Sequence, residues 1–272
     1  MHTVQGTFPV ISQRLNTRPV DISGLNNNFA IPSAFEGEVL VESQATRKAI
    51  LERLRALALA SSPTDIVVIF LAGHGTELPH NLGFYFLPYD APAPARSDRT
   101  PLPPETMAKG LLSEGDITQA LEPLRARYSA LILDTCSSGT ILEGQQLGPL
   151  EEHSRRFMRL AYEKGMHVVV AAQSEKVAVE RREYGHGVLA HALFDLGLLD
   201  DGADQSPRDG LIELGEWLAW GARKADALER EFQGDGHDRP IPQYVPPATA
   251  WPESAVLRAT ISFEAAASGG KH

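Results

Sequence analysis

The fold of this chain is decided by residues 66–75, which read IVVIFLAGHG, and by residues 130–139, which read ALILDTCSSG. In each stretch a short apolar run leads into a polar, glycine-containing turn. Such runs, bounded by glycine and by helical stretches, are typical of buried strands in a parallel sheet. Ligands and reacting groups collect beyond the carboxyl ends of the strands in these sheets. We therefore expect His74 and Cys136, which each follow one run, to meet in one cleft as a nucleophilic Cys-His pair.

The composition narrows the class of protein. With 272 residues, of which 43% are hydrophobic, the chain is long enough to bury one sizeable core. It carries 25 basic and 35 acidic side chains, a net charge of -10, which argues against nucleic acid or an anionic membrane as the main partner. The N-terminus lacks the pattern of a signal peptide, and no apolar run is long enough to cross a bilayer. The single cysteine excludes an internal disulfide, and these features together predict a cytoplasmic protein.

Strand and helix patterns alternate along the chain and predict an α/β fold with a mostly parallel sheet. The expected strands lie at residues 38–41, 66–71, 83–88, 130–133, 167–172 and 256–261. The expected helices lie at residues 43–60, with Ser43 as the cap, from 116 onward, around 155–160, and at 188–198 and 211–225. A long proline-rich loop is expected to follow residue 88. The predicted domains are an irregular N-terminal arm at residues 1–36 with a short strand near 8–11, one folded domain at 37–263, and a disordered tail at 264–272.

The residues at the two strand ends fit acyl transfer. Cys136 requires a base because the thiolate is the nucleophile, and the ordinary pKa of a histidine suits His74 to that role. The backbone N–H of Gly75, which has no side chain, is expected to form an oxyanion hole with the N–H of Cys136. Each residue also has a structural explanation, since an isolated cysteine is usually a buried apolar residue and a single histidine usually a packing residue. Their occurrence together at matching strand ends favours catalysis.

These two segments resemble the catalytic signatures of caspase-like cysteine peptidases. The segments FLAGHGT at residues 70–76 and LILDTCSSG at 131–139 are similar to the metacaspase, paracaspase and bacterial caspase-like branch. A third likeness, over residues 171–189, is to the strand and following helix of bacterial members, and the whole resemblance covers about residues 38–245. It implies a caspase-haemoglobinase-like three-layer sandwich, in which helices flank a mostly parallel central sheet. Animal caspases have Gln-Ala-Cys around the nucleophile, where this chain has Asp134-Thr135-Cys136.

Asp134 determines the substrate prediction. Side chains alternate along a strand, so Asp134 and Cys136 project from the same face, and a carboxylate beside the nucleophile suits an Arg or Lys side chain. In the resembled metacaspases and paracaspases an aspartate here lines the specificity pocket, which implies a protein or peptide substrate cleaved after a basic residue. Glu180 is a second candidate carboxylate of this pocket, and Ser174 a candidate for contacts with the substrate backbone. The alternatives are that Asp134 caps a helix or turn and that Glu180 is a solvated ion-pair partner.

No metal or cofactor is expected at the predicted site. The other histidines show no metal-ligand spacing with Cys136, which argues against zinc. These histidines are His153, His167 and His191. His186 is expected at a helix start, where it has a structural role.

Residues 204–216 superficially resemble an EF-hand calcium loop. Gln205 and Pro207 occupy two of its ligand positions, so we expect no strong calcium binding there. Calcium activation, which is known in some metacaspases, is not decided by the sequence.

The resemblance breaks at the N-terminus. Caspase-like domains open with a strand and a helix before the strand placed here at 38–41, and residues 1–36 hold no convincing version of that pair. We expect either an unusual substitute or a regulatory domain or partner that supplies the missing elements. Two basic segments, at residues 96–109 and 155–156, predict self-processing. The rival functions are a non-catalytic interaction module with the same fold and a thiol-dependent peptide ligase.

Overall fold

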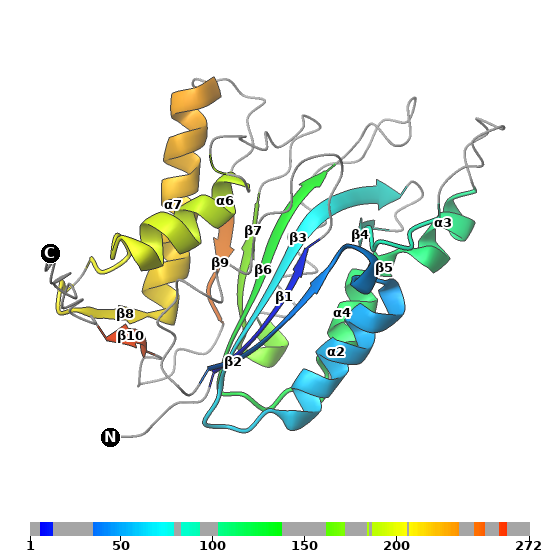
Figure 1. Cartoon of the computed structure of the whole chain (residues 1–272), viewed down its shortest axis with the longest axis horizontal. Coiled ribbons are helices and arrows are strands. Elements are labelled where there is room, and N and C mark those ends of the chain that lie inside the picture. The colour runs from blue at the N-terminus through cyan, green and yellow to red at the C-terminus, as the bar shows by residue number, and fades with distance from the viewer. Residues whose placement is uncertain are drawn as a thin grey trace, which may run out of the picture.

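A mixed, mostly parallel sheet forms the centre of the molecule (Figure 1). The computed structural model describes residues 6–12, 35–78, 83–92, 103–137, 162–171, 184, 187–205, 207–233, 242–247 and 256–259. The strands of the central sheet are β1 (Gly6–Ser12), β2 (Phe35–Val41), β3 (Ile66–Leu78), β4 (Gly83–Phe86), β5 (Leu112–Ser113), β6 (Tyr128–Ser137), β7 (His167–Val170) and β9 (Gln243–Val245). Their order is β2-β1-β3-β6-β7-β9, with β4 pairing β3 and β5 pairing β4. The neighbouring strands β2, β1, β3, β6 and β7 pair parallel with one another in this order. Strands β4, β5 and β9 pair antiparallel with their neighbours. The predicted α/β fold is confirmed.

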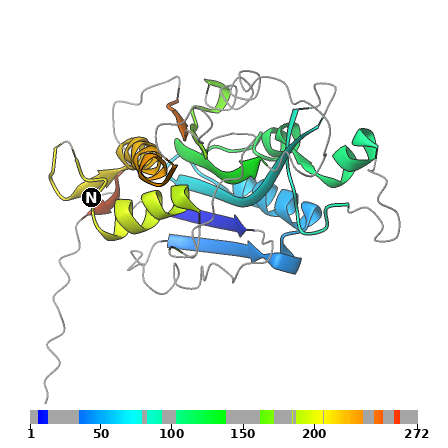
Figure 2. The ribbon, with the colours of Figure 1, turned by 90° about the horizontal axis from the view of Figure 1, so that it is seen from above.

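Helices cover both faces of the sheet, as Figures 1 and 2 show. The helices are η1 (Glu42–Gln44), α2 (Arg47–Ala60), α3 (Pro104–Gly110), α4 (Glu114–Ala120), α6 (Val188–Ala190), the π-helix η3 (His191–Leu199) and α7 (Leu214–Gln233). On one face, α2 and α4 bury Leu54 and Ile117, while on the other α6, η3 and α7 bury Leu189 and Trp217. Strand β3 gives its odd-numbered apolar residues to the first core and its even-numbered ones to the second, as the period of two requires.

Strand β1 lies inside the sheet, between β2 and β3. Its Val10 is in parallel register with Val39 on one side and Phe70 on the other. This is the short strand expected near residues 8–11, and it corrects the prediction of an irregular arm for residues 6–12. Of the two alternatives given for the missing strand, the structure shows the first, because residues 6–12 of this chain occupy that place in the sheet. Pro9, which has no N–H for the ladder, made the segment read as irregular. Residues 13–34 lie outside the described part.

Several helix ends differ from the expected ones. Helix α2 begins at Arg47 because Thr46, rather than Ser43, caps it by accepting a hydrogen bond from the N–H of Ala49 (3.2 Å). Helix α4 begins before residue 116 because Ser113 and Asp116 form a capping box. Part of the predicted loop is helix α3, whose first residue is a proline.

A second, two-stranded sheet pairs β8 (Leu211–Glu213) antiparallel with β10 (Val256–Ala259). The helix expected from residue 211 therefore begins at 214, because residues 211–213 alternate in burial and pair as a strand. The late strand expected at 256–261 is present at 256–259, and residues 260–272, which include the predicted tail, lie outside the described part. Within the part of the chain that the structure describes, no helix is both long enough and apolar enough to span a bilayer.

Candidate functional site

Strands β3 and β6 extend past β1 and β7 at the carboxyl edge of the sheet. β1 accompanies β3 as far as Ala72, and β7 accompanies β6 as far as Leu133. Beyond these residues β3 and β6 stay paired with each other, and His74 lies opposite Cys136. Because neighbouring strands are about 4.8 Å apart, the two backbones bring these residues to adjacent positions. The sheet thus places the histidine and the cysteine next to each other past the ends of β1 and β7, where β4 begins to pair with β3.

The strand backbone just before His74 depends on glycine. Gly73 has a φ of 151°, a value that residues with a side chain rarely adopt. The carbonyl of His74 accepts a hydrogen bond from the N–H of Leu87 (2.9 Å), which extends the ladder with β4. Gly75 is paired with Ser137 in β6 and with Phe86 in β4. The oxyanion role predicted for Gly75 therefore requires its N–H to face a substrate rather than a neighbouring strand.

The carboxylate of Asp134 lies against the start of helix α6. Its Oδ2 accepts a hydrogen bond from the N–H of Ala190 (3.2 Å). A Cβ built on Gly187 would lie 2.5 Å from that same oxygen. The helix cap that the sequence offered as the alternative for Asp134 is therefore present. The half-buried carboxylate makes this contact two residues before Cys136 on the same strand.

The remaining predicted residues of the pocket are not placed. Glu180 and Ser174 lie outside the described residues, and so does His186, which was expected at a helix start rather than in the pocket. Tyr184 is the described residue nearest to Glu180 in sequence, and its ring stacks on that of His191 with centroids 3.9 Å apart. The roles predicted for Glu180 and Ser174 therefore stay predictions.

Two histidines that we set aside as metal ligands have side-chain partners. His167 Nδ1 lies 2.7 Å from the hydroxyl of Tyr244, and His191 Nδ1 lies 2.7 Å from Oδ2 of Asp195. Burial lowers the pKa of His167 to about 4 and raises the pKa of Tyr244 to about 12. Among the described residues, no group of three or more His, Cys, Asp or Glu side chains could hold a metal ion.

The carboxylates of the EF-hand-like segment bind backbone N–H groups. The N–H of Gly210 donates to Oδ2 of Asp204 (3.0 Å), and the N–H of Gln205 donates to Oε1 of Glu216 (2.7 Å). Gly210 has a φ of 82°, so the turn needs a glycine at this position. These carboxylates hold the connection between η3 and β8.

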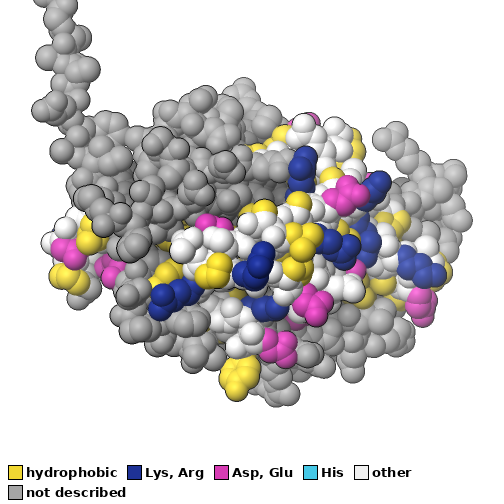
Figure 3. Space-filling model, turned by 90° about the horizontal axis from the view of Figure 1, so that it is seen from below, with side chains coloured by type: hydrophobic (Ala, Val, Ile, Leu, Met, Phe, Trp, Pro, Cys, Tyr) yellow, Lys and Arg dark blue, Asp and Glu magenta, His cyan; other side chains and the backbone are white. Residues whose placement is uncertain are grey.

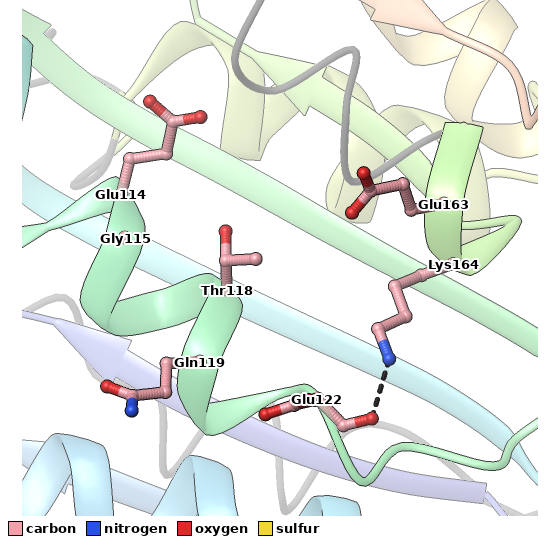
Figure 4. A pocket seen from close by; sticks show the side chains of 7 residues that line it. All are labelled: Glu114, Gly115, Thr118, Gln119, Glu122, Glu163 and Lys164. Atoms are coloured by element: carbon pink, nitrogen blue, oxygen red, sulfur yellow. Dashed lines mark hydrogen bonds between the residues drawn. The ribbon is translucent and has the colours of Figure 1, made fainter.

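A hollow of about 640 Å³ lies beside α4, on the face of the sheet away from α6 (Figure 4). Its lining includes Glu114, Thr118 and Glu163, and Lys164 Nζ donates across it to the carbonyl of Glu122 (2.6 Å). Among its described lining residues there is no cysteine or histidine, and none of them belongs to β3 or β6. On the face shown in Figure 3, Lys and Arg side chains lie among acidic and apolar ones rather than in one continuous basic patch.

The comparisons with known proteins agree with this geometry. The family model for the caspase domain matches residues 5–197. This chain belongs to the caspase family. The matched span begins before β1 and includes His74 and Cys136, so β1 is part of the caspase domain. Membership supports a cysteine peptidase acting on proteins, although the family also includes non-catalytic members.

A solved structure shows the same fold as this caspase-family chain. Protein GSU0716 from Geobacter sulfurreducens is 14% identical, and the likeness covers 91% of this chain and 95% of that chain, with a TM-score of 0.55. At this identity the likeness concerns the fold alone. No curated protein sequence matches the chain significantly.

Sequence reasoning missed two residues of the site, Gly187 and Ala190. Both belong to the start of α6 and contact the carboxylate of Asp134 through the backbone. The sequence of this caspase-family chain does show a glycine just before an apolar helical run. Contacts between this backbone and a strand distant in the sequence, however, leave no pattern of residue types that would reveal them.

Proposed function

We propose that this caspase-family chain is a cysteine endopeptidase that hydrolyses peptide bonds after Arg or Lys. One observation carries the proposal. His74 and Cys136 are opposite each other on β3 and β6, beyond the points where β1 and β7 end. A histidine next to a cysteine at the carboxyl ends of two parallel strands is an arrangement that suits nucleophilic thiol chemistry.

In the proposed reaction His74 takes the proton of the Cys136 thiol, and the thiolate attacks the carbonyl carbon of the scissile bond. Backbone N–H groups of Gly75 and Cys136 stabilise the negative oxygen that forms. His74 then gives its proton to the leaving amine, which departs and leaves an acyl-enzyme. Water, activated by the same imidazole, releases the acid and restores the thiol.

Asp134 supports the choice of a basic substrate. A half-buried carboxylate next to the nucleophile attracts a guanidinium or ammonium group through charge-assisted hydrogen bonds. Glu180 and Ser174 are proposed as further contacts, to the basic side chain and to the substrate backbone.

Self-processing is a second part of the proposal. Basic residues lie at Arg96, Arg99, Lys109, Arg155 and Arg156. Lys109 is exposed on α3, and the other four lie outside the described residues. Incubation of the pure protein and sequencing of new termini tests this point. Fragments that also form in Cys136→Ala would come from a contaminating protease.

Fluorogenic peptides ending in Arg, Lys, Asp or Asn test the main proposal, with and without calcium. We expect turnover of the Arg and Lys peptides, and its loss in Cys136→Ala and in His74→Ala. Thr118→Ala, in the separate hollow beside α4, is the matched control that keeps activity. Preferred turnover of the Asp peptide would overturn the specificity, and equal activity of Cys136→Ala would overturn the site.

The two rival functions give different products in the same assay. A non-catalytic module turns over none of the peptides, although the protein is folded. A ligase joins the acyl group to an added amino-acid amide, and mass spectrometry then detects the new amide bond in place of the free acid.

A further inference from the structure

Gly187 meets the Asp134 carboxylate at the start of helix α6. Its backbone has φ −65° and ψ 155°, a conformation that any residue adopts, so the backbone does not require glycine here. The neighbouring carboxylate is what excludes a side chain. A Cβ at this position would lie 2.5 Å from Oδ2, 2.9 Å from Oδ1 and 3.0 Å from Cγ of Asp134. Contacts this short force one of the two residues to move.

Residue 187 is held in place by the helix that follows it. Its carbonyl accepts a hydrogen bond from the N–H of His191 (2.9 Å), the first bond of the helix. Leu189 and Leu193 bury the helix against the sheet, with 2% and 0% of their surface exposed. If residue 187 moved away from Asp134 instead, this packed first turn of the helix would unwind. Asp134, which is half-buried and lies just past the last residue of β6 that pairs with β7, is therefore the residue that a Cβ would displace.

The carboxylate is also held by the helix. The N–H of Ala190, in the first turn, donates to Oδ2 of Asp134 (3.2 Å). N–H groups of a first helical turn have no partner inside the helix, and their partial positive charge stabilises a carboxylate. Contact with Gly187 and the bond from Ala190 together fix where the negative charge lies relative to Cys136.

We infer that Gly187 is a positioning residue for substrate selection: the absence of its Cβ lets Asp134 rest against the start of α6, where it receives the basic side chain of the substrate. The role in selection rests on the proposed function, whereas the contact between the two residues does not. Any larger residue at position 187 moves the carboxylate and weakens the preference for Arg or Lys.

Two peptides that differ only in having Arg or citrulline before the scissile bond test the inference, because citrulline has nearly the same shape without the charge. In Gly187→Ala we expect the ratio of kcat/KM for Arg over citrulline to fall at least tenfold, mainly through a higher KM for Arg. A general structural defect lowers both values equally and leaves the ratio unchanged. Gly115→Ala is the matched control, since its Cβ would lie 3.7 Å from the nearest atom, and its ratio should equal that of the wild type.

A double-mutant cycle on the melting temperature keeps the inference testable if activity is low. When Asp134→Ala removes the carboxylate, Gly187→Ala has room for its Cβ and should cost much less stability than in the wild type. Folding of the double variant where Gly187→Ala alone does not fold gives the same support. Equal costs in both backgrounds would overturn the contact, and an unchanged ratio of Arg over citrulline would overturn the role in selection. A wild-type enzyme that does not prefer Arg refutes the proposed specificity, and with it the role in selection, while the cycle still measures the contact.

Discussion

His74 on β3 and Cys136 on β6 are opposite each other in a parallel pair of strands, although 61 residues of sequence separate them. Neither residue depends on a loop for this position, because both belong to the strands themselves. The pairing of ten consecutive residues in one register, from Ile66 with Tyr128 to Gly75 with Ser137, sets their relation. A slip of one residue would move one side chain to the other face of the sheet, so the register is essential to the proposed chemistry.

Alkylation of Cys136 should depend on His74. Since the chain has one cysteine, the rate of modification by iodoacetamide reports the thiolate of that residue alone. We expect the rate at pH 7 to fall about tenfold in His74→Ala, because a thiol without a neighbouring imidazole is mostly protonated at this pH. Mass spectrometry over a pH series measures it. Equal rates for the wild type and His74→Ala at every pH would show that His74 does not activate the Cys136 thiol.

Two substitutions of Asp134 should separate its roles. Asp134→Asn keeps an oxygen that accepts from the N–H of Ala190, whereas Asp134→Ala removes the cap. We expect Asp134→Ala to lower the free energy of unfolding by about 1 kcal/mol relative to Asp134→Asn, the usual loss for a cap. Both should lose the preference for basic peptides, because both lack the charge.

Urea unfolding of the two Asp134 variants measures the difference, with activity on Arg and citrulline peptides read on the same samples. Equal stability of the two variants would show that the bond from Ala190 contributes nothing. Retained preference for Arg in Asp134→Asn would show that the negative charge of Asp134 does not select the substrate.

The parts predicted from the sequence are those that short patterns determine. Apolar runs such as residues 66–71 identified the buried strands, and alternating helices implied a parallel sheet. The strand ends then placed His74 and Cys136 at one edge, which the structure shows for their backbones. Positions along a strand can be predicted because local sequence shows both which residues alternate between the two faces and where the strand ends.

The parts that were missed depend on contacts between distant segments. The strand near residues 8–11 was expected, but its place in the central sheet was missed, because Pro9 weakens the strand pattern and the pairing with β2 and β3 joins distant segments. Residues 211–213 read as the start of a helix, because their pairing with β10 is more than 40 residues away in the sequence. Gly187 was part of a resembled segment but received no role, because its constraint is the side chain of Asp134 rather than its own backbone.

Stability should fall below pH 6.5 through His167. Burial lowers the pKa of this residue to about 4, whereas its ordinary value is 6.5. Between these values the unfolded chain binds a proton that the folded chain does not, so the free energy of unfolding decreases as the pH falls through this range. The full effect of this one residue is about 3 kcal/mol.

The measurement is urea unfolding at several pH values between 4 and 7 for the wild type and for His167→Gln, whose amide keeps a partner for the Tyr244 hydroxyl. The variant should lose less stability than the wild type as the pH falls. Parallel curves for the two proteins would assign the acid sensitivity to other groups.

Trp217 should be the tryptophan on which the α7 side of the core most depends. It is fully buried, and its indole N–H donates to the carbonyl of Leu193 (2.6 Å), which joins α7 to the π-helix η3. Trp217→Phe removes this donor, so the buried carbonyl of Leu193 loses a hydrogen bond, and the smaller ring leaves a small cavity. We expect the free energy of unfolding to fall by about 2 kcal/mol or more. Trp220→Phe, in the same helix at a half-buried position, is the matched control and should cost less. Chemical denaturation compares the two variants, and an equal loss in both would mean that the bond to Leu193 adds nothing to ordinary packing.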